Sequence, residues 1–333
     1  MSHRQRHQLR IGLLLCGVVV AWVAVRGYYL ATPLDVAGRS RIFRVTRGET
    51  LAQVGDRLVD SALVSRHASL GLWGRLAGAD RCVRPGAFEL SPVQTPLEIL
   101  RTLVSGRPIP LRVTLPEGLT CLQMMERISR ALDLPLPDLL AAAADSAWLR
   151  SLGLPGSLEG YLFPETYFFD GGSEPRAVLE RLIRLGFEKV GDVRMARAAA
   201  LGLTRHQLLT LASIVEAESA LPFERRRISA VFRNRLRLGW PLQADPTVAY
   251  AVGQPGRKLT GADLEVDSPY NTYLRAGLPP GPICCPGLTS IDAALWPLET
   301  CPDLYFVARG DGGHIFSRTL DGHNQARRVV GLN

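Results

Sequence analysis

The sequence predicts an α+β protein with an apolar N-terminal helix, and three observations support this class. Short β-type runs lead through a glycine-containing turn into apolar residues at helical spacing, at 43–58 and again at 111–128. Two further β-type runs, 304–309 and 314–317, flank a glycine-rich turn and predict a hairpin near the end of the chain. An unbroken apolar run fills residues 11–25. We therefore expect short strands and many helices.

Composition limits the class of protein further. The chain has 333 residues, of which 47% are hydrophobic and 21% charged, and this excludes wholesale disorder. A mean hydropathy of +0.08 excludes a polytopic membrane protein. A chain of this length is expected to hold two domains. The net charge of +8 fits a polyanionic partner or an anionic membrane face.

The first 31 residues have the pattern of a single membrane anchor. Residues 1–10 contain three arginines and no acid, and they precede the apolar run. The run extends over residues 11–31 if Arg26 reaches the far interface, where Tyr28 and Tyr29 would join the aromatic belt. By the positive-inside rule, residues 1–10 form a cytoplasmic basic tail, residues 11–31 form the anchor, and the rest of the chain lies outside the cytoplasm.

A cleaved signal peptide is the alternative interpretation, because it has the same basic and apolar regions. No clear small-residue cleavage site precedes Thr32, which favours the uncleaved anchor. In both interpretations the working part of the protein is extracytoplasmic.

The front half contains two similar stretches. Phe43–Leu58 and Leu111–Ile128 each hold a β-type run, a turn with glycine, a threonine in the N-cap position and a helical pattern. We interpret residues 42–107 as one module and residues 108–190 as a second, repeat-like or linking region. Chance similarity is the alternative to a duplication.

The strand, Gly-x-Thr turn and two helices over residues 42–80 resemble LysM modules. The resemblance implies a small βααβ domain that binds glycan. A structural or docking module is the alternative.

One carboxylate has an unusual position in the helical pattern of residues 208–220. Helical phase places Glu218 on the same face as Leu211, Ile214 and Val215, and Pro222 ends the helix soon after. Desolvation on an apolar face disfavours the charged form and raises the pKa of a carboxyl. A raised pKa is what a general acid needs, so Glu218 is the candidate catalytic residue.

The neighbouring carboxylate and arginines allow a second interpretation. Glu216 lies about 200° away on the helix, and we expect it to be solvated or paired. Three arginines at 225–227 follow, and one of them could form a salt bridge with either glutamate.

The stretch Ile214–Ser219 resembles the Glu-Ser element of lytic transglycosylases, and more specifically that of the MltG (YceG-like) endolytic murein transglycosylase family. Further motifs occur in the order of that family: Leu158–Tyr167, Val231–Leu236, Leu242–Val248, Tyr270–Tyr273, Gly277–Ile283, Asp311–Phe316 and His323–Asn324. The resemblance is loose from about residue 42 and close from 159 to 324. One departure is Cys284–Cys285, where the family pattern has small or amide residues.

The resemblance implies a fold, a reaction and a location. In the family the catalytic glutamate precedes Ser or Thr, which here identifies Glu218. The implied enzyme is a carbon–oxygen lyase that cleaves the β-1,4 bond between N-acetylmuramic acid and N-acetylglucosamine in nascent glycan strands and leaves 1,6-anhydro ends. Residues 191–333 would form its mixed α+β catalytic domain. The family also implies a single pass through the inner membrane, a periplasmic bulk and partnership with membrane-bound peptidoglycan synthases.

Sugar sites need aromatic faces and planar hydrogen-bonding groups, and several residues offer them. The candidate substrate-binding residues are Ser219, Gln243, Asp245, Thr247, Tyr270, Asn271, Thr272, Tyr273, Glu159 and Tyr161. The alternation of Gln243, Asp245 and Thr247 predicts one strand face, although Asp245 before Pro246 is also typical of a turn. Core packing is the alternative for Tyr161. Asp245, Glu159 and Glu165 are the candidates for a second polar role.

The remaining features exclude other classes. The helical pattern 223–238 carries six arginines opposite an apolar stripe, and we expect a solvated basic face, with binding of peptide-stem carboxylates as the functional alternative. An extracytoplasmic domain is not expected to bind nucleic acid. No Cys-x-x-Cys or Cys/His spacing occurs, so we predict neither a metal site nor another cofactor.

Two other functions remain open from the sequence. A non-catalytic glycan-binding scaffold of the cell-wall synthesis machinery would need only the LysM-like front half. A hydrolytic muramidase would use two carboxylates and water instead of one carboxylate.

Overall fold

The computed structural model describes residues 3–76 and 83–331, and the chain forms two compact units. Unit 1 comprises Met1–Arg112 and Phe168–Ser173, and unit 2 comprises Val113–Tyr167 and Glu174–Asn333. The α+β class and the apolar N-terminal helix are confirmed. The finer division at 42–107, 108–190 and 191–333 stays a prediction.

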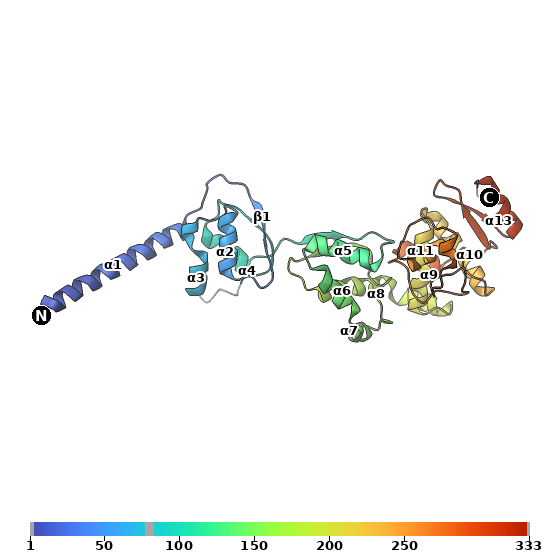
Figure 1. Ribbon diagram of the computed structural model, residues 1–333, viewed down its shortest axis with the longest axis horizontal. Coiled ribbons are helices and arrows are strands. Elements are labelled where there is room, and N and C mark those ends of the chain that lie inside the picture. The colour runs from blue at the N-terminus through green and yellow to red at the C-terminus, as the bar shows by residue number, and fades with distance from the viewer. Residues whose placement is uncertain (1–2, 77–82, 332–333) are drawn as a thin grey trace. The chain divides into compact units, whose positions relative to one another are not determined.

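Unit 1 holds one two-stranded sheet and its covering helices, drawn in blue and teal in Figure 1. The elements in order are α1 (His3–Ala31), β1 (Arg41–Val45), α2 (Leu51–Asp60), η1 (Arg66–Ala68), α3 (Leu70–Leu76), β2 (Gly86–Leu90) and α4 (Pro96–Ser105). β1 pairs antiparallel with β2, with Arg41 opposite Leu90 and Val45 opposite Gly86. The order strand, helix, helix, strand is therefore present, while residues 77–82 of the predicted module lie outside the described part.

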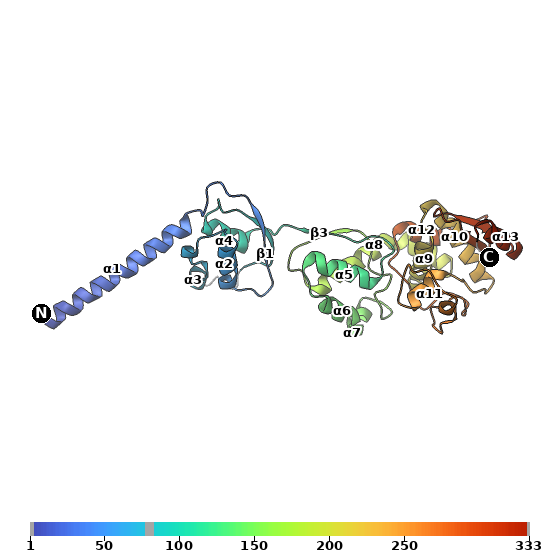
Figure 2. The ribbon, with the colours of Figure 1, turned by 45° about the horizontal axis from the view of Figure 1, so that its top comes forward.

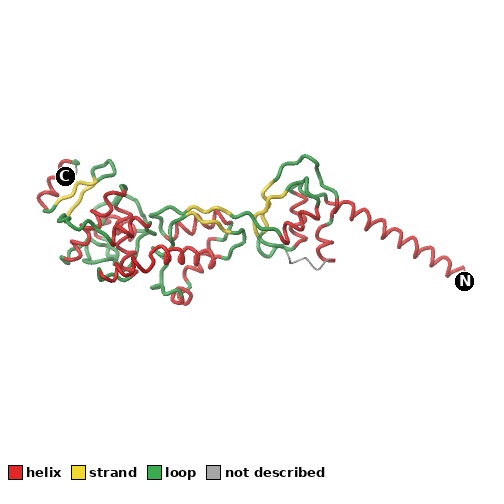
Figure 3. The backbone as a smooth tube through the Cα atoms, turned by 180° about the vertical axis from the view of Figure 1, so that it is seen from behind, coloured by secondary structure: helices red, strands yellow, loops and turns green. Residues whose placement is uncertain are grey.

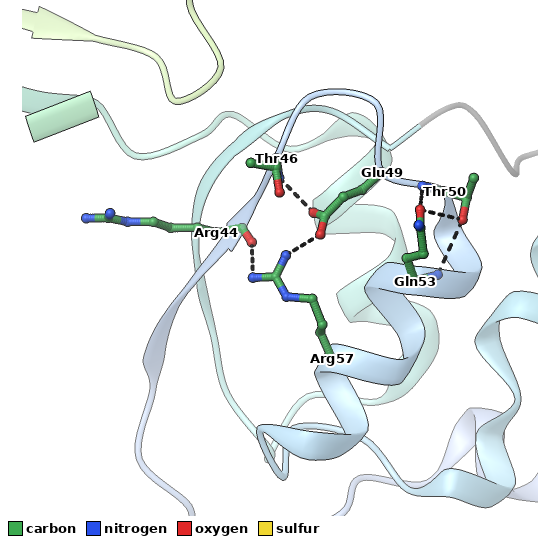
Figure 4. Close-up of polar contacts among 6 residues, drawn as sticks. All are labelled: Arg44, Thr46, Glu49, Thr50, Gln53 and Arg57. Carbon is green, nitrogen blue, oxygen red and sulfur yellow. Dashed lines mark hydrogen bonds and ion pairs between the residues drawn. The ribbon is translucent and has the colours of Figure 1, made fainter. Parts of the chain in front are cut away.

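The turn between β1 and α2 is fixed by side chains, as Figure 4 shows. Thr50 caps α2 in a capping box with Gln53, which satisfies amides that the first turn leaves without partners. Arg57 binds the Glu49 carboxylate and donates at 2.8 Å to the carbonyl of Arg44. The helix is thereby tied to the strand before it, and its apolar face covers the buried side chain of Phe43.

The C-terminal end of α1 packs on the other elements of unit 1. Leu30 lies against the apolar core of the unit. The Arg26 guanidinium donates to the carbonyl of His67 at 3.2 Å, and the rings of Tyr29 and His67 lie 4.9 Å apart. The segment Leu13–Ala31 is long and apolar enough to cross a membrane.

Unit 2 is mostly helical, and its strands form short pairs, drawn in yellow in Figure 3. Its elements are α5 (Cys121–Leu132), α6 (Leu136–Ala144), α7 (Ser146–Ser151), α8 (Pro175–Ala200), α9 (Arg205–Glu218), η2 (Pro222–Glu224), α10 (Arg225–Arg237), α11 (Asp245–Ala251), η3 (Ala262–Glu265), α12 (Leu288–Leu295), β5 (Tyr305–Ala308), β6 (His314–Ser317) and α13 (Leu320–Val329). β3 (Leu111–Thr114) and β4 (Thr166–Phe169) pair where the chain passes between the units. The predicted hairpin is confirmed, because β5 and β6 are antiparallel.

Helix α9 is the central element of a group of helices in unit 2. It contacts α8, α10, α11 and α12, which gather around it in Figure 2. All residues from Leu208 to Val215 are buried, so the helix is covered on every side and not only on the one face that the sequence predicted. A helix covered in this way holds whatever its last turn carries in a fixed position.

Candidate active site

Glu218 is the last residue of α9, and the local sequence explains why the helix ends there. Thr204 caps the first turn in a capping box with Gln207. At the other end Ser219 adopts an extended conformation with φ −105° and ψ 110°, and Pro222 opens η2. The carboxyl of Glu218 therefore lies at the negative end of the helix dipole, which disfavours its charged form.

The surroundings keep a proton on Glu218. Burial of the carboxyl is the main cause, and the nearby carboxylate of Asp245 is the second, so that the pKa of Glu218 is raised to about 8. No hydrogen bond to this carboxyl occurs among the residues that the structure describes. The residue is nevertheless partly exposed. Glu218 is thus a protonated acid at neutral pH that can still be reached from the surface, as the helical phase predicted.

Asp245 is the carboxylate whose charge raises the pKa of Glu218. It begins α11, which packs against α9, and its side chain is exposed. The hydroxyl of Tyr273 donates a hydrogen bond of 2.5 Å to Oδ1 of Asp245. Burial, Asp245 and then Glu218 raise the pKa of Tyr273, so its hydroxyl keeps its proton and acts as a donor. Glu218, Asp245 and Tyr273 therefore form one group of interacting side chains.

The prediction of a strand through Gln243, Asp245 and Thr247 is wrong. Asp245 and Thr247 lie in the first turn of α11, with Pro246 between them, and Thr247 is fully buried. Proline is well tolerated in a first helical turn because its missing amide has no partner to lose there. An alternation of three residues is too short to separate a strand from a helix start, so the three side chains do not share one face.

The segment before α11 is held by the loop 270–273. The amide of Gln243 donates to the carbonyl of Thr272 at 3.0 Å, and the amide of Ala244 donates to the Thr272 hydroxyl at 3.0 Å. The hydroxyls of Thr247 and Thr272 lie 2.9 Å apart. Gln243 has a φ of +52°, which is uncommon for a residue with a side chain and is maintained by these bonds.

The predicted residues Tyr270 to Tyr273 have separate positions. Asn271 is fully buried, and its amide nitrogen donates to the carbonyls of Leu264 and Val266 at 2.9 Å. It therefore organises the loop and does not face outward. Tyr270 is partly exposed, and its ring lies 5.0 Å from that of Tyr250.

Arg235 is a residue of this site that the sequence did not single out. Its guanidinium donates to the carbonyls of Leu304 and Leu242 at 2.7 and 2.9 Å and to Oε1 of Gln243 at 3.0 Å. A solvated position was expected for the arginines of this helix, and this is wrong for Arg225 and Arg235, which are both buried. Helical phase contained the signal, because Arg235 follows Ile228 by seven residues and so lies on the apolar face.

Glu216 is paired, which is one of the two positions that the sequence predicted, and its side chain is buried. Its Oε1 lies 2.7 Å from Nη2 of Arg225, and its Oε2 accepts the amide of Gly287 at 3.0 Å. Burial raises the pKa of Glu216, while the Gly287 amide and Arg225 oppose that rise. The pair joins α9 to α10 and to the start of α12.

Glu159 and Tyr161 are both buried in unit 2, and each has its own polar partners. Glu159 accepts the amide of Cys121 at 2.9 Å and the hydroxyl of Tyr250 at 3.4 Å, and burial raises its pKa to about 7. The Tyr161 hydroxyl lies 3.0 Å from Nδ1 of His206. The side chain of Ser219 is also engaged, because its hydroxyl donates to the carbonyl of Leu221 at 2.8 Å.

The predicted residues therefore divide into two sets. Gln243, Asp245, Tyr270 and Tyr273 are exposed or partly exposed. Ser219, Thr247, Asn271, Thr272, Glu159 and Tyr161 are buried. Cys284 and Cys285, which depart from the family pattern, are buried as well. Within the described residues no cluster of His, Cys, Asp and Glu could hold a metal ion.

Comparison with known proteins places the chain in a family. A family model described as the YceG-like family matches residues 43–329. A protein from Bacillus subtilis named endolytic murein transglycosylase is 28% identical over 330 residues, covering 93% of this chain and 90% of that protein. A Streptococcus pneumoniae protein of the same name is 26% identical over 317 residues, covering 85% of this chain and 57% of that protein.

A solved structure agrees with this placement. The crystal structure of a yceG-like protein from Listeria monocytogenes has a TM-score of 0.62 and 31% sequence identity, covering 86% of this chain and 98% of that one. Because the family model extends from β1 in unit 1 to α13 in unit 2, the chain belongs to the YceG-like family.

Proposed function

We propose that this protein is an endolytic lytic transglycosylase that cleaves the β-1,4 bond between N-acetylmuramic acid and N-acetylglucosamine in nascent peptidoglycan strands. The observation that carries the proposal is Glu218, an accessible carboxyl at the end of a buried helix whose pKa is raised to about 8. The names of the relatives from B. subtilis and S. pneumoniae support the same reaction.

In this reaction Glu218 acts first as an acid and then as a base. Its proton goes to the glycosidic oxygen, and the bond from that oxygen to C1 of the muramic acid breaks. The Glu218 carboxylate then takes the proton of the C6 hydroxyl of the same sugar, while the C6 oxygen bonds to C1. The product is a 1,6-anhydro sugar, and Glu218 has regained its proton. No water is consumed, because the nucleophile is already part of the substrate.

The position of each predicted residue suggests how the glycan is held. Gln243, Asp245, Tyr270 and Tyr273 reach the surface near α9 and α11, and we infer that they contact sugar rings and amide groups. The buried Thr247, Asn271 and Thr272 maintain the segments that carry these four residues.

Hydrolysis by a muramidase is the second candidate, and one observation favours it. Asp245 lies close enough to Glu218 to raise its pKa, and two interacting carboxyls also occur in glycosidases that use water. The two reactions differ in their products, since hydrolysis adds one water to the new end.

The rest of the chain supports a membrane-anchored enzyme. We infer that the anchor predicted at residues 11–31 crosses the inner membrane once, with residues 1–10 cytoplasmic and the chain after Ala31 periplasmic. Arg26, Tyr29 and Leu30 pack on the other elements of unit 1, so residues 11–25 remain to cross the bilayer. This part of the helix is about 22 Å long at a rise of ~1.5 Å per residue. This is shorter than the ~30 Å hydrocarbon core, so unit 1 would lie directly against the membrane surface.

Unit 1 is the candidate glycan-binding part. Its order β1, α2, α3, β2 supports a LysM-like module, and peptidoglycan strands would be its ligand. Peptidoglycan synthases in the same membrane are the proposed partners, since they produce the nascent strands.

The proposal is tested with the full-length protein in detergent and uncrosslinked glycan strands. Mass spectrometry should find anhydro-muramic ends with the wild type and none with Glu218→Gln. Ends heavier by one water would identify a muramidase. Binding of glycan without any product from the folded wild type would identify a scaffold instead.

A further inference from the structure

We propose that Asp245 is a second catalytic residue, a fixed carboxylate that faces the reacting sugar and stabilises the positive charge that forms at its C1. The proposal rests on the proposed function, because it assumes that the bond to C1 is broken after Glu218 gives its proton.

Asp245 lies near the acid Glu218. Asp245 and Glu218 lie on two packed helices, at the start of α11 and at the end of α9. Asp245 is exposed, whereas the Glu218 carboxyl is desolvated. When two close carboxyls have such different surroundings, the solvated one holds the charge and the desolvated one holds the proton. The pair thus presents an acid and an anion to the same substrate.

Hydrogen bonds orient Asp245 before substrate arrives. Tyr273 donates to Oδ1 of Asp245 at 2.5 Å, and no described residue makes a hydrogen bond to its other oxygen. The chain just before it is fixed by Thr272 and by the buried Arg235, which binds the carbonyl of Leu242 and the side chain of Gln243. A charge that does not need to reorient is the most effective kind of electrostatic catalyst.

The backbone is strained close to Asp245. Gln243, two positions before Asp245, has a φ of +52°. A residue with a side chain adopts this conformation only under strain, and such strain is concentrated at functional sites. The strain is explained if the conformation is needed to aim Asp245.

Asp245 takes no part in making or breaking bonds during the reaction. The Glu218 proton moves to the glycosidic oxygen, which leaves with the electron pair of its bond to C1. The positive charge shared by C1 and the ring oxygen then faces the Asp245 carboxylate. The C6 oxygen bonds to C1 and gives its proton to Glu218. Asp245 forms no bond and ends unchanged.

The test compares Asp245→Asn, Tyr273→Phe and the control Asp267→Asn in the full-length protein. Asp267 is an exposed carboxylate of unit 2 that pairs with Arg275. Asp245→Asn should lower kcat by about 100-fold or more with little change in KM, as for loss of one preorganised charge partner. Tyr273→Phe should lower kcat by about 10-fold. Asp267→Asn should be unchanged.

The pH profile separates a catalytic role from a structural one. Glu218, Asp245 and Tyr273 are the titratable groups that interact here, and Arg235 is the cation that acts on Tyr273. Asp245→Asn removes the like charge that helps to raise the pKa of Glu218. The residual activity of this variant should therefore begin to fall at a lower pH than that of the wild type. Melting temperatures within a few degrees of the wild type would verify that the variants are folded.

Two outcomes would overturn the proposal. In the first, Asp245→Asn keeps wild-type kcat and pH profile while Glu218→Gln is inactive, which leaves the proposed function intact. In the second, Asp245→Asn loses activity only in proportion to lost folded protein, and Tyr273→Phe keeps the full rate. If Glu218→Gln is also fully active, the proposed function itself is wrong.

Discussion

Nη2 of Arg225 lies 2.7 Å from Oε1 of Glu216, and this pair distinguishes the two carboxyls at the end of α9. Both side chains of the pair are less than 10% exposed. Glu218, two residues later, has no arginine or lysine partner among the described residues, and its pKa is raised to about 8. One glutamate therefore fastens the helix to α10, while the other is available for proton transfer.

The first prediction concerns the structural pair. Arg225→Ala leaves the Glu216 carboxylate buried without its cation, which should lower the free energy of unfolding by about 3–5 kcal/mol. Chemical unfolding measures the loss. The control is Arg184→Ala, which breaks an exposed pair with Glu180 and should cost about 1 kcal/mol or less. Equal losses in the two variants would contradict the structural role.

The second prediction concerns the pH dependence of activity. Because the pKa of Glu218 is about 8, the residue carries its proton below that pH and loses it above. The value of kcat/KM for glycan cleavage should therefore fall as the pH rises through about 8. Initial rates between pH 5 and 10 measure this limb, and a rate that keeps rising to pH 10 would rule out Glu218 as the acid.

The third prediction concerns stability. An acid whose pKa is higher in the folded than in the unfolded chain makes folding less favourable as the pH rises from about 4.5 to about 8. Glu218→Gln removes this penalty and should stabilise the protein by about 1–2 kcal/mol at pH 7.5, after allowance for solvent screening. At pH 4 the variant and the wild type should be equal, because both side chains are then neutral.

The control for this measurement is Glu188→Gln on the exposed side of α8. It should leave the stability unchanged at both pH values. A Glu218→Gln protein that is less stable than the wild type at pH 7.5 would show that the carboxyl is held by contacts that favour its charge.

The fourth prediction concerns Glu159. Glu159→Gln keeps one oxygen that accepts from the Cys121 amide, and its NH2 group can donate to the oxygen of the Tyr250 hydroxyl, so stability at pH 7 should change by less than about 1 kcal/mol. Glu159→Ala leaves the Cys121 amide buried without a partner and should lower stability by about 2–3 kcal/mol. Thermal unfolding compares the two, and similar losses would show that the charge of Glu159, and not its hydrogen bonds, matters.

Much of the fold follows from local pattern. The Thr caps at 50, 95, 120 and 204 and the apolar spacing after them are sufficient to start four helices, because each satisfies its first amides within four residues. The hairpin of β5 and β6 follows from a glycine-rich turn between two β-type runs. The burial of the Glu218 carboxyl could be predicted because the face of α9 on which it lies follows from helical phase.

The rest of the site depends on contacts between distant parts of the chain. Asp245 meets Tyr273 across 28 positions, and Glu159 meets Tyr250 across 91. Local periodicity contains no information on such contacts. The sequence could therefore suggest a polar role for these residues but not the partners that they contact. Three alternating residues were also too few to decide between a strand and the first turn of α11, where Pro246 favours the helix start.

The most direct test of the central claim is to run the reaction in water enriched in ¹⁸O. The full-length protein is incubated with uncrosslinked glycan strands, and the new ends are analysed by mass spectrometry. If Glu218 directs the C6 hydroxyl to C1, the new muramic ends should be anhydro sugars without ¹⁸O, and Glu218→Gln should produce none. Incorporation of one ¹⁸O at each new end would contradict the account, because water would then be the nucleophile.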